Sequence, residues 1–121
     1  MKQSIIAEKS KSFAIRIVKL YKYLTMIAEQ KEFILSKQLL RSGTSVGANI
    51  KEALRAQSRA DFRSKLNIAL KEASESEYWI ELLGETEYIS KEQFESLIED
   101  NRELIKILTS IVKSTEQQGL Q

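Results

Sequence analysis

The segment from Gln38 to Glu52, QLLRSGTSVGANIKE, is the part of the chain against which the other segments are predicted to pack. On a helix, its apolar and small residues recur every three or four positions and form one stripe, made of Leu39, Gly43, Val46 and Ile50 and continued by Ala53 and Leu54. Each of the glycines at 43 and 47 costs a helix about 1 kcal/mol relative to alanine. Their spacing predicts that another helix backbone approaches closely there.

A row of short or amide side chains runs beside this stripe and consists of Gln38, Ser42, Ser45, Asn49 and Glu52. Side chains of this size suit close contact between helices better than plain exposure to solvent. We therefore predict that Gly43, Ser45, Gly47 and Asn49 lie at a helix-packing or subunit interface.

The length of 121 residues predicts a single domain, residues 1–121, with an ordered core at about residues 10–114. Cysteine and histidine are both absent, which excludes disulfide frameworks, thiol catalysis and the commonest general base and metal ligand. We therefore expect no enzyme activity, no cofactor and no metal. Proline is also absent and glycine occurs only four times, so the chain is predicted to be nearly all helix.

Four segments with a helical apolar repeat follow one another, at about residues 10–28, 36–57, 58–84 and 90–114. Ser36, Ser58 and Ser90 are the predicted N-caps, and Ser90 is predicted to form a capping box with Gln93. Gly84 is the predicted stop of the third helix. Short connections between helices of this length predict an all-α, antiparallel up-down-up-down four-helix bundle.

The predicted third helix has an apolar face wider than one neighbouring helix needs. Ile68, Trp79 and Leu82 lie to one side of its main stripe, which predicts contact with either a second helix or another subunit. Glu77 and Asn101 fall within the apolar stripes of the third and fourth helices. A buried polar group must be paired or hydrogen-bonded, so both residues are predicted to be structural.

The G-x-S-x-G pattern at residues 43–47, GTSVG, does not predict a nucleophile elbow. That motif requires a turn from a strand into a helix and a histidine to accept the serine proton. Here the surroundings are helical and histidine is absent, so the pattern indicates helix packing.

The charges are unevenly distributed along the chain. Residues 1–71 hold 15 Lys and Arg against 5 Asp and Glu, whereas residues 72–121 hold 4 against 12, giving +10 and −8 within a net charge of +2. One interpretation is that a basic helical hairpin packs beside an acidic one, and the other is recognition of a partner. Cations at helical spacing can follow a phosphate backbone, and the candidates for contact with nucleic acid are Lys37, Arg41, Lys51, Arg55, Arg59 and Arg63.

The N-terminal apolar run is too short for a signal peptide. No run of apolar residues reaches the length of a membrane span. We therefore expect a cytoplasmic protein without membrane contact.

The segments QLLRSGTSVGANIKEA (38–53), DF (61–62), KLNIALKEASE (65–75) and YW (78–79) resemble a bacterial family. These are the four-helix-bundle proteins encoded in intervening sequences of 23S ribosomal RNA genes, which are often labelled ribosomal proteins. The resemblance extends over about residues 13–114 and is most specific in the second and third helices. A related branch is the accessory variability determinant of diversity-generating retroelements.

The resemblance implies an antiparallel four-helix bundle without enzymatic activity, assembled into ring-like homo-oligomers for which pentamers are expected. It also implies a basic surface suited to RNA or DNA, and a reverse transcriptase or another ribonucleoprotein as a possible partner. The positions that match the family motif are Arg41, Ser45, Asn49 and Glu52 in the second helix and Lys71, Glu72, Glu75 and Trp79 in the third. None of them is catalytic in the family.

Two functions therefore remain open. The first is binding of nucleic acid or a ribonucleoprotein through the basic part of the chain. The second is a protein-binding adaptor or scaffold that assembles head to tail through its basic and acidic halves, without nucleic acid.

Overall fold

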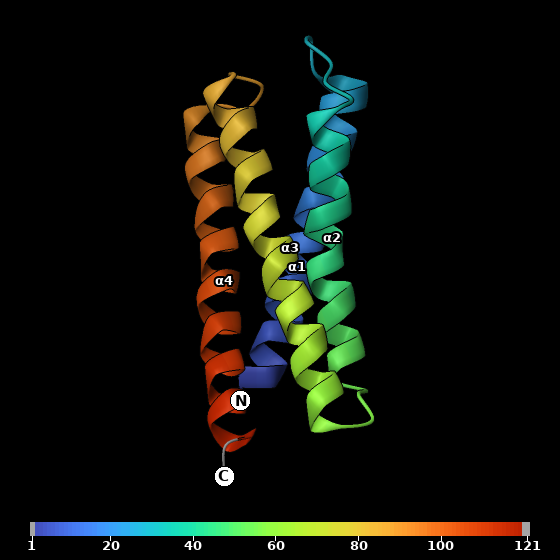
Figure 1. Cartoon of the computed structure of the whole chain (residues 1–121). Helices are drawn as coiled ribbons and strands as arrows, with labels where there is room; N and C mark the ends of the chain where they lie inside the picture. The colour runs from blue at the N-terminus through green and yellow to red at the C-terminus, as the bar shows by residue number, and fades with distance from the viewer. Residues whose placement is uncertain (1, 120–121) are drawn as a thin grey trace.

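The computed structural model describes the backbone of residues 2–119 and the side chains of residues 5–116. Within these residues four helices follow one another: α1 (Lys2–Lys22), α2 (Leu35–Ala53), α3 (Arg59–Glu85) and α4 (Lys91–Gly119). A five-residue π-helical turn, η1 (Tyr23–Ile27), extends α1. Consecutive helices pack against each other and α4 also contacts α1, which confirms the predicted all-α, up-down-up-down bundle (Figure 1).

The first helix begins at Lys2 and not near Ser10, where its start was predicted. Ile6 and Ser10 are each 1% exposed and extend the buried stripe of Phe13 and Ile17 toward the N-terminus. The helix begins earlier because Ile6 adds apolar surface to the core at the same helical spacing.

The turn η1 changes which side chains face the core at the end of the first helix. The Ala28 N–H donates to the Tyr23 carbonyl at 2.8 Å, five residues back, and this wider turn shifts the register of the residues within it. Leu24 and Ala28 stay buried, but Ile27 is 71% exposed. The apolar repeat of residues 10–28 predicts that Ile27 belongs to the buried stripe of the first helix, and this prediction is wrong.

The start of α2 is capped by a residue that the sequence analysis did not identify. The carboxylate of Glu32 accepts hydrogen bonds from the backbone N–H groups of Ile34, Leu35 and Ser36, at 3.0, 3.0 and 2.6 Å. Ser36, the predicted N-cap, lies inside the helix, and its hydroxyl donates to the Glu32 carbonyl. The predicted cap is wrong because a carboxylate four residues earlier satisfies the free N–H groups of the first turn.

The other two predicted helix starts are confirmed. Ser58 accepts a hydrogen bond from the Asp61 N–H at 3.0 Å at the start of α3. Ser90 and Gln93 form the reciprocal capping box before α4, with bonds of 2.8 and 3.1 Å. The second helix ends at Ala53, earlier than the predicted end near residue 57.

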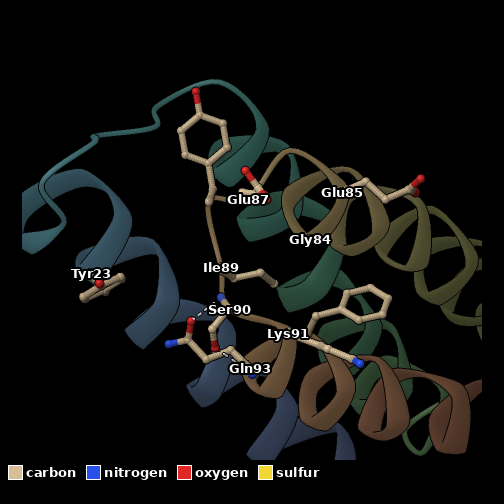
Figure 2. Close-up of a pocket in the computed structure, with 10 residues that line it drawn as sticks. Tyr23, Gly84, Glu85, Glu87, Ile89, Ser90, Lys91 and Gln93 are labelled. Atoms are coloured by element: carbon tan, nitrogen blue, oxygen red, sulfur yellow. Dashed lines mark hydrogen bonds between the residues drawn. The ribbon is translucent and has the colours of Figure 1, made fainter.

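Gly84 does not stop α3 by adopting a left-handed backbone. The helix runs to Glu85, and the residue with a positive φ, 65°, is Glu87 in the connection that follows. A Cβ atom on Gly84 would lie 2.6 Å from a ring carbon of Phe94. The glycine is therefore needed because the first turn of α4 approaches α3 closely, around the connection shown in Figure 2.

The interior of the bundle is apolar with a few buried polar side chains. Leu24, Val46, Ile80 and Leu108, one from each helical segment, are fully buried. Asn101 is also fully buried, and its amide donates to the Ala73 carbonyl of α3 at 3.1 Å.

Glu77 lies at the side of the apolar stripe of α3 and not within it. The buried position of the stripe at this level is Ser76. The Glu77 carboxylate is half-buried and pairs with the Arg102 guanidinium of α4 at 2.9 Å. Among the residues that the structure describes, no helix has the length and apolar character of a membrane span.

Candidate functional site

The predicted series of cations does not lie on one continuous helix. Lys51 is in the last turn of α2, Arg55 lies in the connection, and Arg59 and Arg63 are in the first turns of α3. The first three side chains are exposed and that of Arg63 is half-buried. We call these four residues the basic end, because they surround the α2–α3 connection at one end of the bundle (Figure 1).

Few carboxylates lie near the basic end in the sequence. Between residues 51 and 65 the only acidic residues are Glu52 and Asp61. The Glu52 carboxylate is 3.5 Å from the Lys65 ammonium, so part of its charge is neutralised locally. This stretch of the chain therefore carries a net positive charge, which favours contact with anions.

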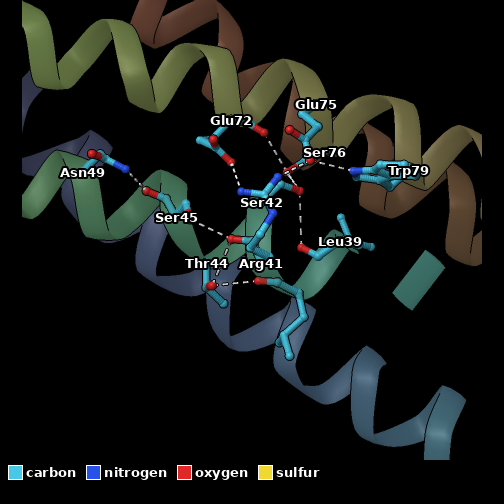
Figure 3. Close-up of polar contacts among 11 residues, drawn as sticks. Leu39, Arg41, Ser42, Thr44, Ser45, Asn49, Glu72, Glu75, Ser76 and Trp79 are labelled. Carbon is cyan, nitrogen blue, oxygen red and sulfur yellow. Dashed lines mark hydrogen bonds and ion pairs between the residues drawn. The ribbon is translucent and has the colours of Figure 1, made fainter. Parts of the chain in front are cut away.

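Lys37 and Arg41, the other two predicted cations, lie outside the basic end. Lys37 is exposed in the first turns of α2. The Arg41 guanidinium contacts two carboxylates of α3, that of Glu72 at 3.1 Å and that of Glu75 (Figure 3). Arg41 therefore joins α2 to α3, and its charge is largely balanced within the chain.

The contacts of Arg41 belong to a larger polar seam between α2 and α3, made of Arg41, Ser42, Glu72, Glu75, Ser76 and Trp79. The Trp79 indole N–H donates to the Glu75 carboxylate at 2.9 Å. In the buried part of the seam, the hydroxyl oxygens of Ser42 and Ser76 are 2.8 Å apart. The seam fixes the register of the two helices through hydrogen bonds that the surrounding apolar core does not provide.

The remaining residues that match the family motif make local contacts. The Ser45 hydroxyl donates to the Arg41 carbonyl, and the Asn49 amide donates to the Ser45 carbonyl, at 2.7 and 2.8 Å and within α2. Lys71 is exposed beside Glu75 and its charge acts on that carboxylate. Of the motif positions, Arg41, Glu72 and Glu75 thus form hydrogen bonds between α2 and α3.

The electrostatics of the seam favour the ionised state of both partners. The pKa of Glu75 is held below its ordinary value by the hydrogen bond from Trp79 and next by Arg41. The pKa of Arg41 is raised chiefly by its hydrogen bond to Glu75.

The glycines of α2 face the first helix. A Cβ on Gly43 would lie 3.0 Å from a side-chain carbon of Ile17, and one on Gly47 would lie 3.4 Å from the Ser10 carbonyl oxygen. Of the other predicted interface residues, Ile68 is 39% exposed on α3, whereas Trp79 and Leu82 are half-buried. The glycines therefore allow α1 to approach, and Ile68 lies on the outer surface of the bundle.

An exposed apolar cluster at the opposite end of the bundle was not predicted. We call it the apolar tip, and it consists of Met26, Ile27, Phe33 and Ile34, which are 71%, 71%, 56% and 75% exposed. Figure 2 shows Tyr23 of η1 across a hollow from the α3–α4 connection at the same end. Phe33 and Ile34, two large apolar residues in a segment without a helical repeat, were the available sequence signal.

No clustered metal site is formed by the part of the chain that the structure describes: no three carboxylates converge there in a way that could hold an ion. The fold and the polar seam define an antiparallel bundle protein in which the motif residues join helices.

The model of the 23S rRNA-intervening sequence protein family matches residues 2–110, and the chain belongs to this family, as the resemblance predicted. A similar solved structure is the crystal structure of a protein with unknown function from the S23 ribosomal protein family of Bacteroides thetaiotaomicron VPI-5482. The two chains are 63% identical, with 93% of this chain and 99% of that chain covered and a TM-score of 0.90. Comparison with curated proteins gives no match.

Proposed function

We propose that this chain is a non-enzymatic, cytoplasmic homo-oligomer that binds nucleic acid, either RNA or DNA or a ribonucleoprotein, through the basic end. The observation that carries this proposal is the exposure of Lys51 and Arg55 beside the arginines of α3, in a stretch of sequence with few carboxylates. Cations in such an arrangement bind phosphates and release condensed counterions, which supplies affinity without sequence preference.

Arg41 and Lys37 have a smaller part in this proposal than the sequence suggested. Arg41 is engaged by two carboxylates, so a phosphate would have to compete with both. Lys37 lies toward the opposite end of α2 from Lys51. The proposed contact surface is therefore the basic end alone.

A binding assay with matched variants tests the proposal. The double variant Arg55→Ala/Arg63→Ala removes two cations from the basic end. The control Lys22→Ala/Lys91→Ala removes two exposed cations near the opposite end of the bundle. We expect the wild type and the control to bind structured RNA or duplex DNA at low salt, and the arginine variant to bind at least tenfold more weakly.

Equal affinity of the two double variants would contradict the proposal, and so would the absence of any binding at low salt. The mass of each variant in solution must be measured as well, because loss of assembly would also weaken a multivalent contact. We expect all three proteins to have the same mass, that of a homo-oligomer and, by the family resemblance, a pentamer.

A protein-binding adaptor is the alternative function, and the apolar tip favours it. Exposed clusters of large apolar side chains commonly mark surfaces that contact other proteins. If the chain is an adaptor, the variant Ile27→Asp/Ile34→Asp disrupts assembly. The wild type and the arginine variant then both fail to bind nucleic acid. Under the nucleic-acid proposal, the arginine variant keeps its mass and loses binding.

A further inference from the structure

The outer surface of α3 next to the basic end carries cations and short polar side chains without an acidic residue. A shallow hollow there is lined by six residues, which we call the α3 strip: Ala60, Arg63, Ser64, Asn67, Ile68 and Lys71. Ser64, Asn67 and Lys71 are exposed. This surface continues from the basic end along the same helix. A large ligand bound at the basic end would therefore also contact the α3 strip.

The nearby carboxylates of α3 are engaged by cations. Glu72 and Glu75 contact Arg41 of α2, and Glu75 also lies close enough to Lys71 of the strip for the two charges to interact. The strip itself therefore holds two cations, Arg63 and Lys71, and the charge of Lys71 is partly balanced by Glu75.

The second half of α4 lies at the same end of the bundle as the first half of α3, because the two helices are antiparallel (Figure 1). The exposed charged side chains of that half, among the described residues, are Lys106, Lys113 and Glu116. The exposed acidic side chains in the first half of α4, toward the other end of the bundle, are Glu92, Glu95, Glu99, Asp100 and Glu103.

The strip has no aromatic platform for stacking unpaired bases. The exposed aromatic side chains of the described residues are Tyr23, Phe33 and Tyr78. Tyr23 and Phe33 lie at the opposite end of the bundle. Tyr78 is about 16 Å from Asn67 along α3, since an α-helix rises about 1.5 Å per residue. Proteins that bind single strands without sequence preference use such platforms, so the surface is better suited to paired bases.

Resting on the proposed function, we propose that the nucleic acid is duplex DNA and that the α3 strip faces its major groove. The major groove of B-form DNA admits an α-helix, whereas the corresponding groove of A-form RNA is too deep and narrow for side chains to read. The Asn67 amide and the Ser64 hydroxyl are placed to hydrogen-bond base edges. Arg63 of the strip and Arg55 of the preceding connection contact phosphates.

Binding of matched oligonucleotides tests this assignment. Fluorescence anisotropy would be measured with a DNA duplex, an RNA duplex of the same sequence and each single strand, over a series of salt concentrations. We expect the DNA duplex to bind at least tenfold more tightly than the others. Duplexes of differing sequence would then be compared for the wild type and the variant Ser64→Ala/Asn67→Ala.

The strip variant is expected to lose discrimination between duplex sequences by about tenfold while its salt dependence stays unchanged. Arg63→Ala should instead weaken binding to all sequences and reduce the salt slope by about 1. The control Ser12→Ala/Gln38→Ala removes an exposed hydroxyl and an exposed amide from α1 and α2, and it should behave as the wild type.

Tighter binding of the RNA duplex or of a single strand would overturn the assignment, and so would unchanged discrimination in the strip variant. If the arginine variants still lose affinity in that case, the proposed function stands and only the role of the strip fails. A change of mass in the strip variant without a change of discrimination would assign the strip to a contact between subunits and also overturn the inference. No binding to any of these probes at low salt would remove the proposed function itself.

Discussion

At the scale of single residues, the contact between α2 and α3 depends on one carboxylate with two donors. Glu75 accepts hydrogen bonds from the Trp79 indole and from the Arg41 guanidinium. Both donors stabilise the charged form, so the pKa of Glu75 is lower in the folded chain than in the unfolded one. The bonds therefore contribute stability above the ordinary glutamate pKa, and that contribution is lost as the pH falls through the lower folded pKa.

Trp79→Phe is predicted to raise the pKa of Glu75, because it removes the largest of the causes that lower this pKa. The stability difference between wild type and variant should be greatest at neutral pH and should narrow as the pH falls through the lowered pKa of Glu75 in the folded wild type. Any loss of packing is independent of pH and cancels in this comparison. Carboxyl NMR titration of Glu75, with thermal unfolding at several pH values, measures both effects, and an unchanged Glu75 pKa would contradict this explanation.

Asn101 is predicted to cost stability. Its amide nitrogen has a partner, but its buried Oδ1 has none among the described residues. An unsatisfied buried acceptor costs about 1–3 kcal/mol, whereas one hydrogen bond contributes about 1 kcal/mol. Asn101→Leu should therefore raise the free energy of unfolding by about 1 kcal/mol in urea denaturation. A loss of stability of that size would show that Oδ1 has a partner in solution.

At the scale of helices, the sequence correctly predicts four helices and their order. The wrong predictions concern the ends of helices, where hydrogen bonds other than those of a regular α-helix decide the structure. Four apolar repeats and the caps at Ser58 and Ser90 are local signals, so they were readable. The exposure of Ile27 depends on a π-helical turn. The capping of α2 depends on the Glu32 carboxylate, which accepts hydrogen bonds from three backbone N–H groups that follow it in the chain. Neither follows from apolar spacing, because both are set by backbone hydrogen bonds in the connection.

Gly84 gives a prediction at this scale that separates close packing from helix termination. Gly84→Ala should lower the free energy of unfolding by about 1–3 kcal/mol, because the new methyl group meets the Phe94 ring. In a Phe94→Leu background the same change should become neutral or stabilising, since alanine favours helix by about 1 kcal/mol over glycine. Urea denaturation of the four proteins forms a double-mutant cycle. Additive effects would contradict close packing against Phe94 as the reason for the glycine.

At the scale of the whole molecule, the candidate site was only partly predictable. The four cations of the basic end were named from the sequence, since their number and spacing are visible there. Arg41 was grouped with them because its partners Glu72 and Glu75 lie on another helix, and only the fold brings them together. The apolar tip was missed for the related reason that Met26 and Ile27 end the first helical segment, whereas Phe33 and Ile34 lie in the connection that follows.

The antiparallel fold also redistributes the charge of the two halves of the sequence. The basic first half of α3 lies at the same end of the bundle as the second half of α4, whose exposed charged side chains among the described residues are Lys106, Lys113 and Glu116. Cations from both sequence halves therefore gather toward the end of the bundle that holds the α2–α3 connection. An anionic polymer would approach this end, and its affinity would depend on ionic strength.

The salt dependence of binding to a short labelled duplex, measured for the wild type and for Arg55→Ala/Arg63→Ala between about 50 and 200 mM salt, tests whether the basic end binds phosphates. Each phosphate contact contributes about −0.9 to the slope of log affinity against log salt. We predict that the wild type shows a steep negative slope and that the double variant is shallower by about 2. Equal slopes, or affinity that does not change with salt, would contradict a phosphate-binding role for the basic end.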